Sequence, residues 1–234
     1  MTDAPGWCYN KTKSDKWGIN MVKTIVCFGD SNTHGYISKG YGRFTEKERW
    51  TCLLQEYLGD EYAIKEEGLS GRTTVFEDPI EEGLNALPYM YPCLMSHEPV
   101  DLLIIMLGSN DVKQRYAASP QNIAGGMERL IKKAKNTKEA FRDGKPNILL
   151  MVPPAMEEGY GTIYVNGEDG DLCIQKSRAL ASLYESVAKR QECHFLDAGA
   201  VEGVTMNKID FMHISLEGHK KLAEKLAEII PTIV

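Results

Sequence analysis

The chain has 234 residues, of which 43% are apolar and 26% charged, and its formal net charge at pH 7 is −6. This composition is typical of a water-soluble globular protein that is long enough to bury a full core. The sequence has no Lys/Arg-rich run, which argues against nucleic acid as a partner. No apolar segment approaches the ~20 residues that a membrane span needs.

Six cysteines are scattered along the chain, and several lie inside apolar runs. Because none forms a Cys-x-x-Cys pair or stands at zinc-ligand spacing, we expect reduced, mostly buried thiols and no disulfide framework. Reduced thiols indicate a cytoplasmic protein. The six are Cys8, Cys27, Cys52, Cys93, Cys173 and Cys193.

Residues 1–20 differ from the rest, with no periodic pattern and no apolar stretch of the kind found in a signal peptide. Met21 directly precedes the first predicted strand. We therefore expect residues 1–20 to be an N-terminal extension and residues 21–234 to be a single domain. The sequence leaves open whether the extension packs on the surface or at a subunit contact.

Apolar runs alternate with helical patterns five times after residue 21. This alternation predicts an α/β fold, a three-layer α/β/α sandwich around a five-stranded parallel sheet. The short, polar second strand suits an edge position. Strands are expected at 22–28, 62–66, 101–107, 147–152 and 193–197, and helices at 45–58, 79–96, 120–141, 171–191 and 215–230.

Three segments between the predicted strands lead to further predictions. Residues 35–43 form a glycine-rich loop that we consider too long for a simple hairpin and well placed to line a cleft. The helix at 79–96 is expected to be interrupted near Pro88 and Pro92. Residues 155–170 hold four glycines and two tyrosines, and form either a lid or a subunit contact.

A small polar turn, Gly29-Asp30-Ser31, ends the first buried strand. Open α/β sheets bind their ligands at the carboxyl ends of their strands, where a serine can be exposed on a tight turn. The alternative is that Ser31 only caps the following helix. Two more small-residue loops, 68–74 and 108–111, follow strands at the same edge of the predicted sheet.

A nucleophilic serine needs a base and a group that orients the base. Of the five histidines, His213 is the best candidate, because Asp210 lies three residues earlier and can contact its Nδ1. A local capping network is the alternative. His34 is too close to Ser31 in sequence to face it and is expected to line the pocket. His97 has no expected polar partner, His194 is expected to be structural, and His219 to pack or cap.

Transition-state stabilisation in acyl transfer also needs hydrogen-bond donors for the developing oxyanion. The candidates are the backbone N–H groups of Ser31 and Gly71 and the side-chain amide of Asn110. All three follow predicted parallel strands and should therefore lie on one rim.

Four separated stretches resemble the conserved blocks of the SGNH (GDSL) hydrolases, in the same order. They are Gly29-Asp30-Ser31, Gly68-Leu69-Ser70-Gly71, Gly108-Ser109-Asn110-Asp111 and Asp210-Phe211-Met212-His213. The resemblance implies a flavodoxin-like fold, Ser31 as nucleophile, His213 as base and Asp210 as its orienter. It also implies an oxyanion hole of Ser31, Gly71 and Asn110, with no metal ion and no other cofactor.

The second and third blocks look most similar to the aryl esterase and acyltransferase branch, whose members are often oligomeric, so a homo-oligomer is expected. Three residues depart from the family pattern. Asn32 replaces leucine and is expected to leave the catalytic residues untouched. Phe211 replaces a frequent glycine and His34 a larger aromatic residue, and both are expected to bind substrate.

The sequence therefore predicts a cytoplasmic serine esterase for small acetyl-type esters, such as an O-acetylated sugar, or an acyltransferase. A thioesterase or lysophospholipase with a preference for long acyl chains is the alternative among hydrolases. A non-catalytic binding protein on the same scaffold is the alternative outside them. A nucleotide or flavin binder is disfavoured because no Gly-x-Gly-x-x-Gly follows the first strand.

Overall fold

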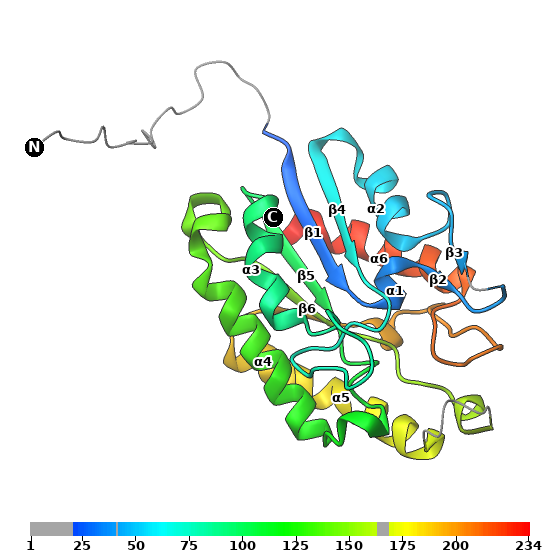
Figure 1. Ribbon diagram of the computed structural model, residues 1–234. Coiled ribbons are helices and arrows are strands. Elements are labelled where there is room, and N and C mark those ends of the chain that lie inside the picture. Colours follow the sequence, from blue (N-terminus) through cyan, green and yellow to red (C-terminus); the bar gives the residue numbers. More distant parts are fainter. Residues whose placement is uncertain (1–20, 41, 163–168) are drawn as a thin grey trace, which may run out of the picture.

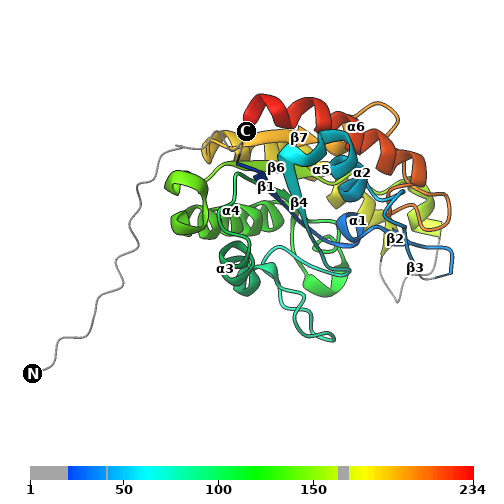
Figure 2. The same ribbon diagram turned by 90° about the horizontal axis from the view of Figure 1, so that it is seen from above.

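The computed structural model describes residues 21–40, 42–162 and 169–234. A parallel sheet of five strands, in the order β4-β1-β5-β6-β7, is covered by helices on both faces (Figures 1 and 2). The three-layer α/β/α prediction and the edge position of the second long strand are thus confirmed.

The strands of the sheet are β1 Lys23–Gly29, β4 Tyr62–Gly68, β5 Leu102–Met106, β6 Ile148–Val152 and β7 His194–Asp197. The helices are α1 Ser31–His34, α2 Trp50–Leu58, α3 Ala86–Ser96, α4 Pro120–Asn136, α5 Gly170–Arg190 and α6 Leu216–Ile233. A separate antiparallel pair joins β2 Tyr36–Ile37 to β3 Gly42–Arg43. Short 3₁₀ turns are η1 Gly59–Glu61, η2 Gln114–Tyr116, η3 Lys138–Ala140, η4 Arg142–Gly144, η5 Glu158–Thr162 and η6 Ala198–Ala200.

Strand register brings the functional loops to one rim. Gly29, at the end of β1, stands opposite Gly68 of β4 on one side and Met106 of β5 on the other. The chain leaves these three strands at the same level, so the loops after them are neighbours although they lie far apart in sequence.

The two faces of the sheet bury separate apolar clusters because side chains alternate along each strand. Ile25 and Cys27 of β1 face α2 and α6. Val26 and Phe28 face the layer made by α3, α4 and α5. Figure 2 shows α2 and α6 on one side of the sheet and α3 and α4 on the other.

Two expectations for the connections are wrong. The segment 35–43 does contain a hairpin, since Tyr36 pairs with Arg43 and Ile37 with Gly42. Only two residues of each arm pair, so the hairpin leaves no period-2 pattern that could reveal it in the sequence.

The second error concerns the helix expected at 79–96, which begins at Ala86 and continues through both prolines. Asn85 caps it by accepting the N–H of Leu87 at 2.9 Å. Pro88 lies in the first turn, where backbone N–H groups have no helical acceptor. Pro88 thus removes no helical hydrogen bond. Pro92 lies further inside the helix, where it removes one hydrogen bond without ending the helix.

The boundaries of two other helices differ from the predicted ones by a few residues. Residues 45–48 precede α2 and form a capping turn in which the Glu48 carboxylate accepts the Thr45 N–H at 2.8 Å. The helix expected to end at 141 ends at Asn136 and is followed by η3 and η4. No helix in the described part of the chain is both long and apolar enough to cross a membrane.

Candidate active site

Ser31 is the first residue of α1, directly after the turn that ends β1. Asp30 caps this helix, its carboxylate accepting the Asn32 N–H at 2.9 Å. A side chain at Gly29 would collide with Thr33, whose Oγ1 would lie 2.0 Å from the added Cβ. Glycine is therefore required here for the chain to pass directly from strand to helix. Ser31 itself is 4% exposed.

The structure brings Ser31, His213 and Asp210 together in one hydrogen-bonded chain. Ser31 Oγ lies 2.8 Å from His213 Nε2, and His213 Nδ1 lies 2.7 Å from Asp210 Oδ2. The side chains of His213 and Asp210 are 12% and 20% exposed. In this arrangement the imidazole can take the hydroxyl proton while the carboxylate stabilises the imidazolium that forms.

Asp210 is held by donors from its own loop and from the hairpin. Its Oδ1 accepts the N–H groups of Met212 and His213, each at 3.0 Å, and the Asn207 amide at 2.9 Å. The Ser38 hydroxyl donates to Oδ2. Burial raises the pKa of Asp210, but the hydrogen bond to His213 and these other donors outweigh it and hold the pKa well below its usual value.

The three expected oxyanion donors lie on loops that are bonded to one another. Arg72 Nη1 donates to the carbonyl of Gly29 at 2.9 Å, and the Asn110 amide donates to the carbonyl of Arg72 at 3.1 Å. Gly71 has a φ of +85°, which a side chain would strain. Neither the Ser31 N–H nor the Gly71 N–H donates to an acceptor within the described residues, so both can serve a ligand.

Two buried carboxylates brace the same loops and were not singled out in the sequence. Asp30 accepts the hydroxyl of Ser109 at 2.5 Å, and burial raises its pKa. Asp111 accepts both the N–H and the hydroxyl of Thr74 through Oδ1, whereas its Oδ2 has no partner in the described chain. Burial raises the pKa of Asp111 to about 6.

Three further contacts of the His213 loop were not predicted from the sequence. Tyr36 packs its ring on the imidazole of His213, with centroids 4.6 Å apart. Asn32 accepts the N–H of Ile214 at 2.8 Å, so this departure from the family pattern contacts the histidine loop. Asn207 Oδ1 accepts the N–H of Ile209 at 2.9 Å, an Asx turn that the polar run before Asp210 could have suggested, and also accepts the Asp210 N–H at 3.1 Å.

The two residues expected to bind substrate lie at the end of α1 and inside the Asp210–His213 loop. His34 is the last residue of α1 and is half-buried; partial burial, with Arg43 nearby, lowers its pKa. Phe211 has a φ of +57°, the left-handed conformation that explains why glycine is frequent there. Its ring packs against Gly159, where an added Cβ would lie 2.4 Å away.

The remaining histidines divide as follows. His219 is buried and accepts the Trp50 N–H at 3.2 Å, as a packing and capping residue should. His194 is exposed at the start of β7. The expectation that His97 has no polar partner is wrong, because its Nε2 lies 2.7 Å from Glu67 Oε1. Glu67 is 30 residues away in sequence, which is why the pair was not predicted.

The segment expected as a lid or subunit contact is described in part. The Glu157 N–H donates to the carbonyl of Phe211 at 3.0 Å, so the start of this segment packs on the Asp210–His213 loop. Residues 163–168 of the segment, and the extension 1–20, lie outside the described residues.

Comparisons with known proteins identify the family and related structures. The model of the GDSL-like lipase/acylhydrolase family matches residues 27–221. A crystal structure of a carbohydrate acetylesterase from Sinorhizobium meliloti covers 91% of this chain and 100% of its own, at 31% identity and a TM-score of 0.79. An aryl esterase from M. smegmatis covers the same shares at 32% identity and a TM-score of 0.81.

A curated acetylxylan esterase from Xylanibacter ruminicola is 26% identical over 228 residues, which are 88% of this chain. They are 42% of that esterase, so the chain spans less than half of this relative's length. The family match covers most of the chain and includes all four blocks. The chain therefore belongs to the GDSL-like lipase/acylhydrolase family, the SGNH hydrolases.

Proposed function

We propose that this protein is a serine esterase that hydrolyses short, acetyl-type carboxylic esters through an acyl-serine intermediate. The observation that carries the proposal is the hydrogen-bonded chain from Ser31 Oγ through His213 to Asp210, at 2.8 and 2.7 Å. A capping network alone would not require His213 Nε2 to face the serine hydroxyl.

The proposed cycle uses the side chains already described. Ser31 Oγ attacks the acyl carbonyl while His213 Nε2 takes its proton, and Asp210 stabilises the imidazolium. The oxyanion accepts hydrogen bonds from the N–H groups of Ser31 and Gly71 and from the Asn110 amide, each worth ~3–4 kcal/mol in the transition state. His213 then protonates the leaving alcohol, and water or another alcohol releases the acyl group.

The short acyl group is supported by the relatives and by one side chain. An acetylxylan esterase and a carbohydrate acetylesterase are both similar to this chain. Phe211 places a ring in the Asp210–His213 loop where the family frequently has glycine, and we propose that it narrows the acyl site. His34 is proposed to contact the alcohol part of the ester, for which an acetylated sugar is our first candidate.

We also propose a cellular location and an oligomeric state. No disulfide joins the five cysteines of the described chain, which fits a cytoplasmic protein. A homo-oligomer is proposed from the aryl esterase branch, and light scattering of the purified protein tests it.

The deciding experiment compares p-nitrophenyl acetate, butyrate, octanoate and palmitate, with wild type, Ser31→Ala and the control Ser186→Ala. Ser186 is exposed on α5, far from His213 in the chain. We expect acetate to be the best substrate and kcat/KM to fall at least about 10⁴-fold in Ser31→Ala only.

Other outcomes select the alternatives. A preference for octanoate or palmitate that still depends on Ser31 would move the substrate to lipids or thioesters. Activity that persists in Ser31→Ala would refute the serine mechanism. If no ester is turned over and a fluorophosphonate fails to label Ser31, the binding-protein alternative is correct.

A further inference from the structure

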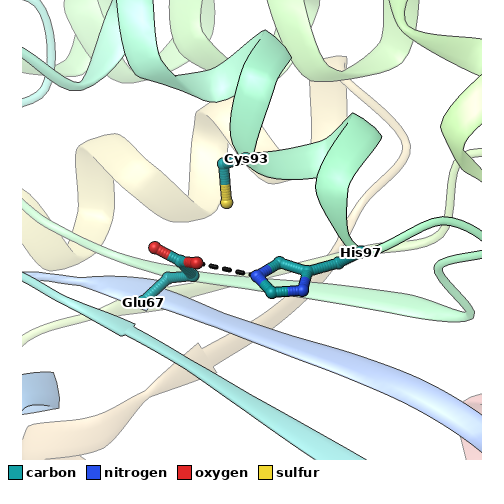
Figure 3. Close-up of side chains that lie close together, drawn as sticks. All are labelled: Glu67, Cys93 and His97. Carbon is teal, nitrogen blue, oxygen red and sulfur yellow. Dashed lines mark hydrogen bonds and ion pairs between the residues drawn. The ribbon is translucent and has the colours of Figure 1, made fainter.

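A second cluster of side chains that can bind a metal ion lies between the end of β4 and the end of α3. Cys93 on α3 is fully buried, and its thiol makes no hydrogen bond within the described residues. It points at the ion pair between Glu67 Oε1 and His97 Nε2, which are 2.7 Å apart (Figure 3). The three ligand-type atoms all lie within 4.8 Å of one another.

We propose that Cys93, His97 and Glu67 bind a divalent metal ion of the zinc class. A thiolate sulfur, an imidazole nitrogen and a carboxylate oxygen are the donor atoms that Zn²⁺ takes in proteins, and water can supply a fourth ligand. The sulfur excludes Mg²⁺ and Ca²⁺ as the preferred ions, because these take oxygen ligands.

The local structure supports a shared ion. Cys93 and His97 are four residues apart at the end of α3, so both side chains lie on one side of the helix, and Glu67 reaches them from β4. Tetrahedral zinc with bonds of about 2.0–2.3 Å separates its ligand atoms by roughly 3.5 Å. The Glu67–His97 pair therefore has to open by about 1 Å, with the ion taking the place of the shared hydrogen.

The surroundings provide access and an outer hydrogen bond. Glu67 lines a surface cavity of about 580 Å³ together with Arg72, Tyr89 and Pro92, which gives an ion a route from solvent. The Tyr89 hydroxyl donates to Glu67 Oε2 at 3.1 Å and so orients the carboxylate, as outer-shell partners of metal ligands do.

Charge and proton balance also close. Binding releases the Cys93 thiol proton to solvent. The hydrogen that His97 Nε2 shares with Glu67 also leaves this nitrogen, to Nδ1 if the imidazole is neutral or to solvent if it is protonated, so that His97 binds as the neutral tautomer with its proton on Nδ1. One thiolate and one carboxylate then neutralise the two positive charges of the ion. The neutral complex does not oppose the nearby guanidinium of Arg72, which holds the Glu67 carbonyl.

This site is independent of the proposed esterase activity, since none of its three ligands contacts Ser31, His213 or Asp210 in the described structure. The test is therefore a binding measurement. The full chain is stripped with a chelator and titrated with Co²⁺, whose bond to a thiolate gives a charge-transfer absorption band that other ligands do not give. Zn²⁺ is then added in competition.

We expect the band to saturate at one equivalent of Co²⁺ and to disappear when Zn²⁺ is added. Cys93→Ser should abolish the band, and His97→Gln and Glu67→Gln should weaken Zn²⁺ binding by more than about tenfold. The matched controls are Cys193→Ser and His194→Gln. These residues are adjacent in the sequence and lie outside the cluster, so both variants should bind Co²⁺ and Zn²⁺ as wild type does.

The proposal is overturned if no thiolate band forms, or if the band survives in Cys93→Ser. It is equally overturned if His97→Gln and Glu67→Gln bind Zn²⁺ as tightly as the controls. These two variants carry the test should the buried Cys93→Ser fail to fold, because both side chains are partly exposed.

Discussion

Asp210 owes one of its hydrogen bonds to a residue outside its own loop. Asn207, Met212 and His213 are its immediate neighbours in sequence, but Ser38 lies 172 residues away, between β2 and β3. Its hydroxyl donates to the same Oδ2 that accepts the imidazole. Ser38 is thus a positioning residue that spreads the negative charge of Asp210.

Ser38→Ala tests this role. Without the hydroxyl the carboxylate is less stabilised and holds the protonated imidazole more strongly, so the acid limb of the kcat/KM profile should move to higher pH. Loss of one hydrogen bond to a charged group should also lower kcat/KM about tenfold. The profile is measured with p-nitrophenyl acetate beside Ser186→Ala. An unmoved acid limb in a folded variant would mean that Ser38 only supports the hairpin.

At the scale of residues, the sequence predicted the three side chains that we propose as catalytic but not the ones that position them. Ser31, Asp210 and His213 lie in recognisable blocks, and the structure brings them within hydrogen-bond distance of one another. Ser38 and Tyr36 have no such signal, because their contacts with the histidine loop form only after distant segments fold together. Glu67 and His97 were missed for the same reason.

Helices α2 and α6 meet through a buried histidine. His219, in the first turn of α6, accepts the N–H of Trp50 at the start of α2. Arg49, at the N-cap position of α2, makes no side-chain capping hydrogen bond, so the histidine serves this end of the helix. The indole of Trp50 in turn donates to the carbonyl of Asn32 at 3.1 Å. The contact between α2 and α6 thereby holds Trp50 in place to bind the residue after Ser31.

This contact makes stability depend on pH. Burial, with the charge of His213, lowers the pKa of His219 to about 3, far below its unfolded value of about 6.5. Protonation therefore favours the unfolded chain, and the stabilisation present above about pH 6.5 is lost toward about pH 3, by up to about 1.4 kcal/mol per pH unit.

The prediction is checked by urea unfolding of wild type and His219→Gln from neutral to mildly acid pH. Glutamine keeps an acceptor for Trp50 but does not titrate, so the variant should lose less stability as the pH falls. His194→Gln, which removes an exposed histidine, should follow wild type. Parallel curves for wild type and His219→Gln would contradict the assignment.

At the scale of elements, long periodic segments were predicted well and short or proline-containing ones were not. The strands of the sheet were found because they are continuous apolar runs. The hairpin of β2 and β3 has too few paired residues to show alternation. Helix α3 tolerates Pro92 because packing against its neighbours outweighs one missing hydrogen bond, which local propensity does not reveal.

Both apolar clusters share the same sheet. Residues of β1, β5 and β6 contribute alternately to each cluster, so neither face can lose its partners without exposing the strands of the other. We propose that residues 21–234 fold as one cooperative unit, as the unbroken alternation of strands and helices in the sequence suggests.

Coincident unfolding curves are the expected result. In a variant with Trp7→Phe and Trp17→Phe, fluorescence reports Trp50, which is buried between the sheet and α6. Far-UV circular dichroism follows all the helices. Both signals should change at the same urea concentration. An earlier loss of Trp50 fluorescence would show that the α2–α6 layer unfolds separately.

The separation of 182 positions between Ser31 and His213 in the sequence has a consequence for protein synthesis. A ribosome makes the hydroxyl early and the imidazole late, and the two cannot meet before α6 follows and docks beside α2. By the proposed mechanism, a nascent chain thus carries an ordinary, unreactive serine, and only the finished and folded product can form an acyl-enzyme. The cell is spared a partly made hydrolase attached to its translation machinery.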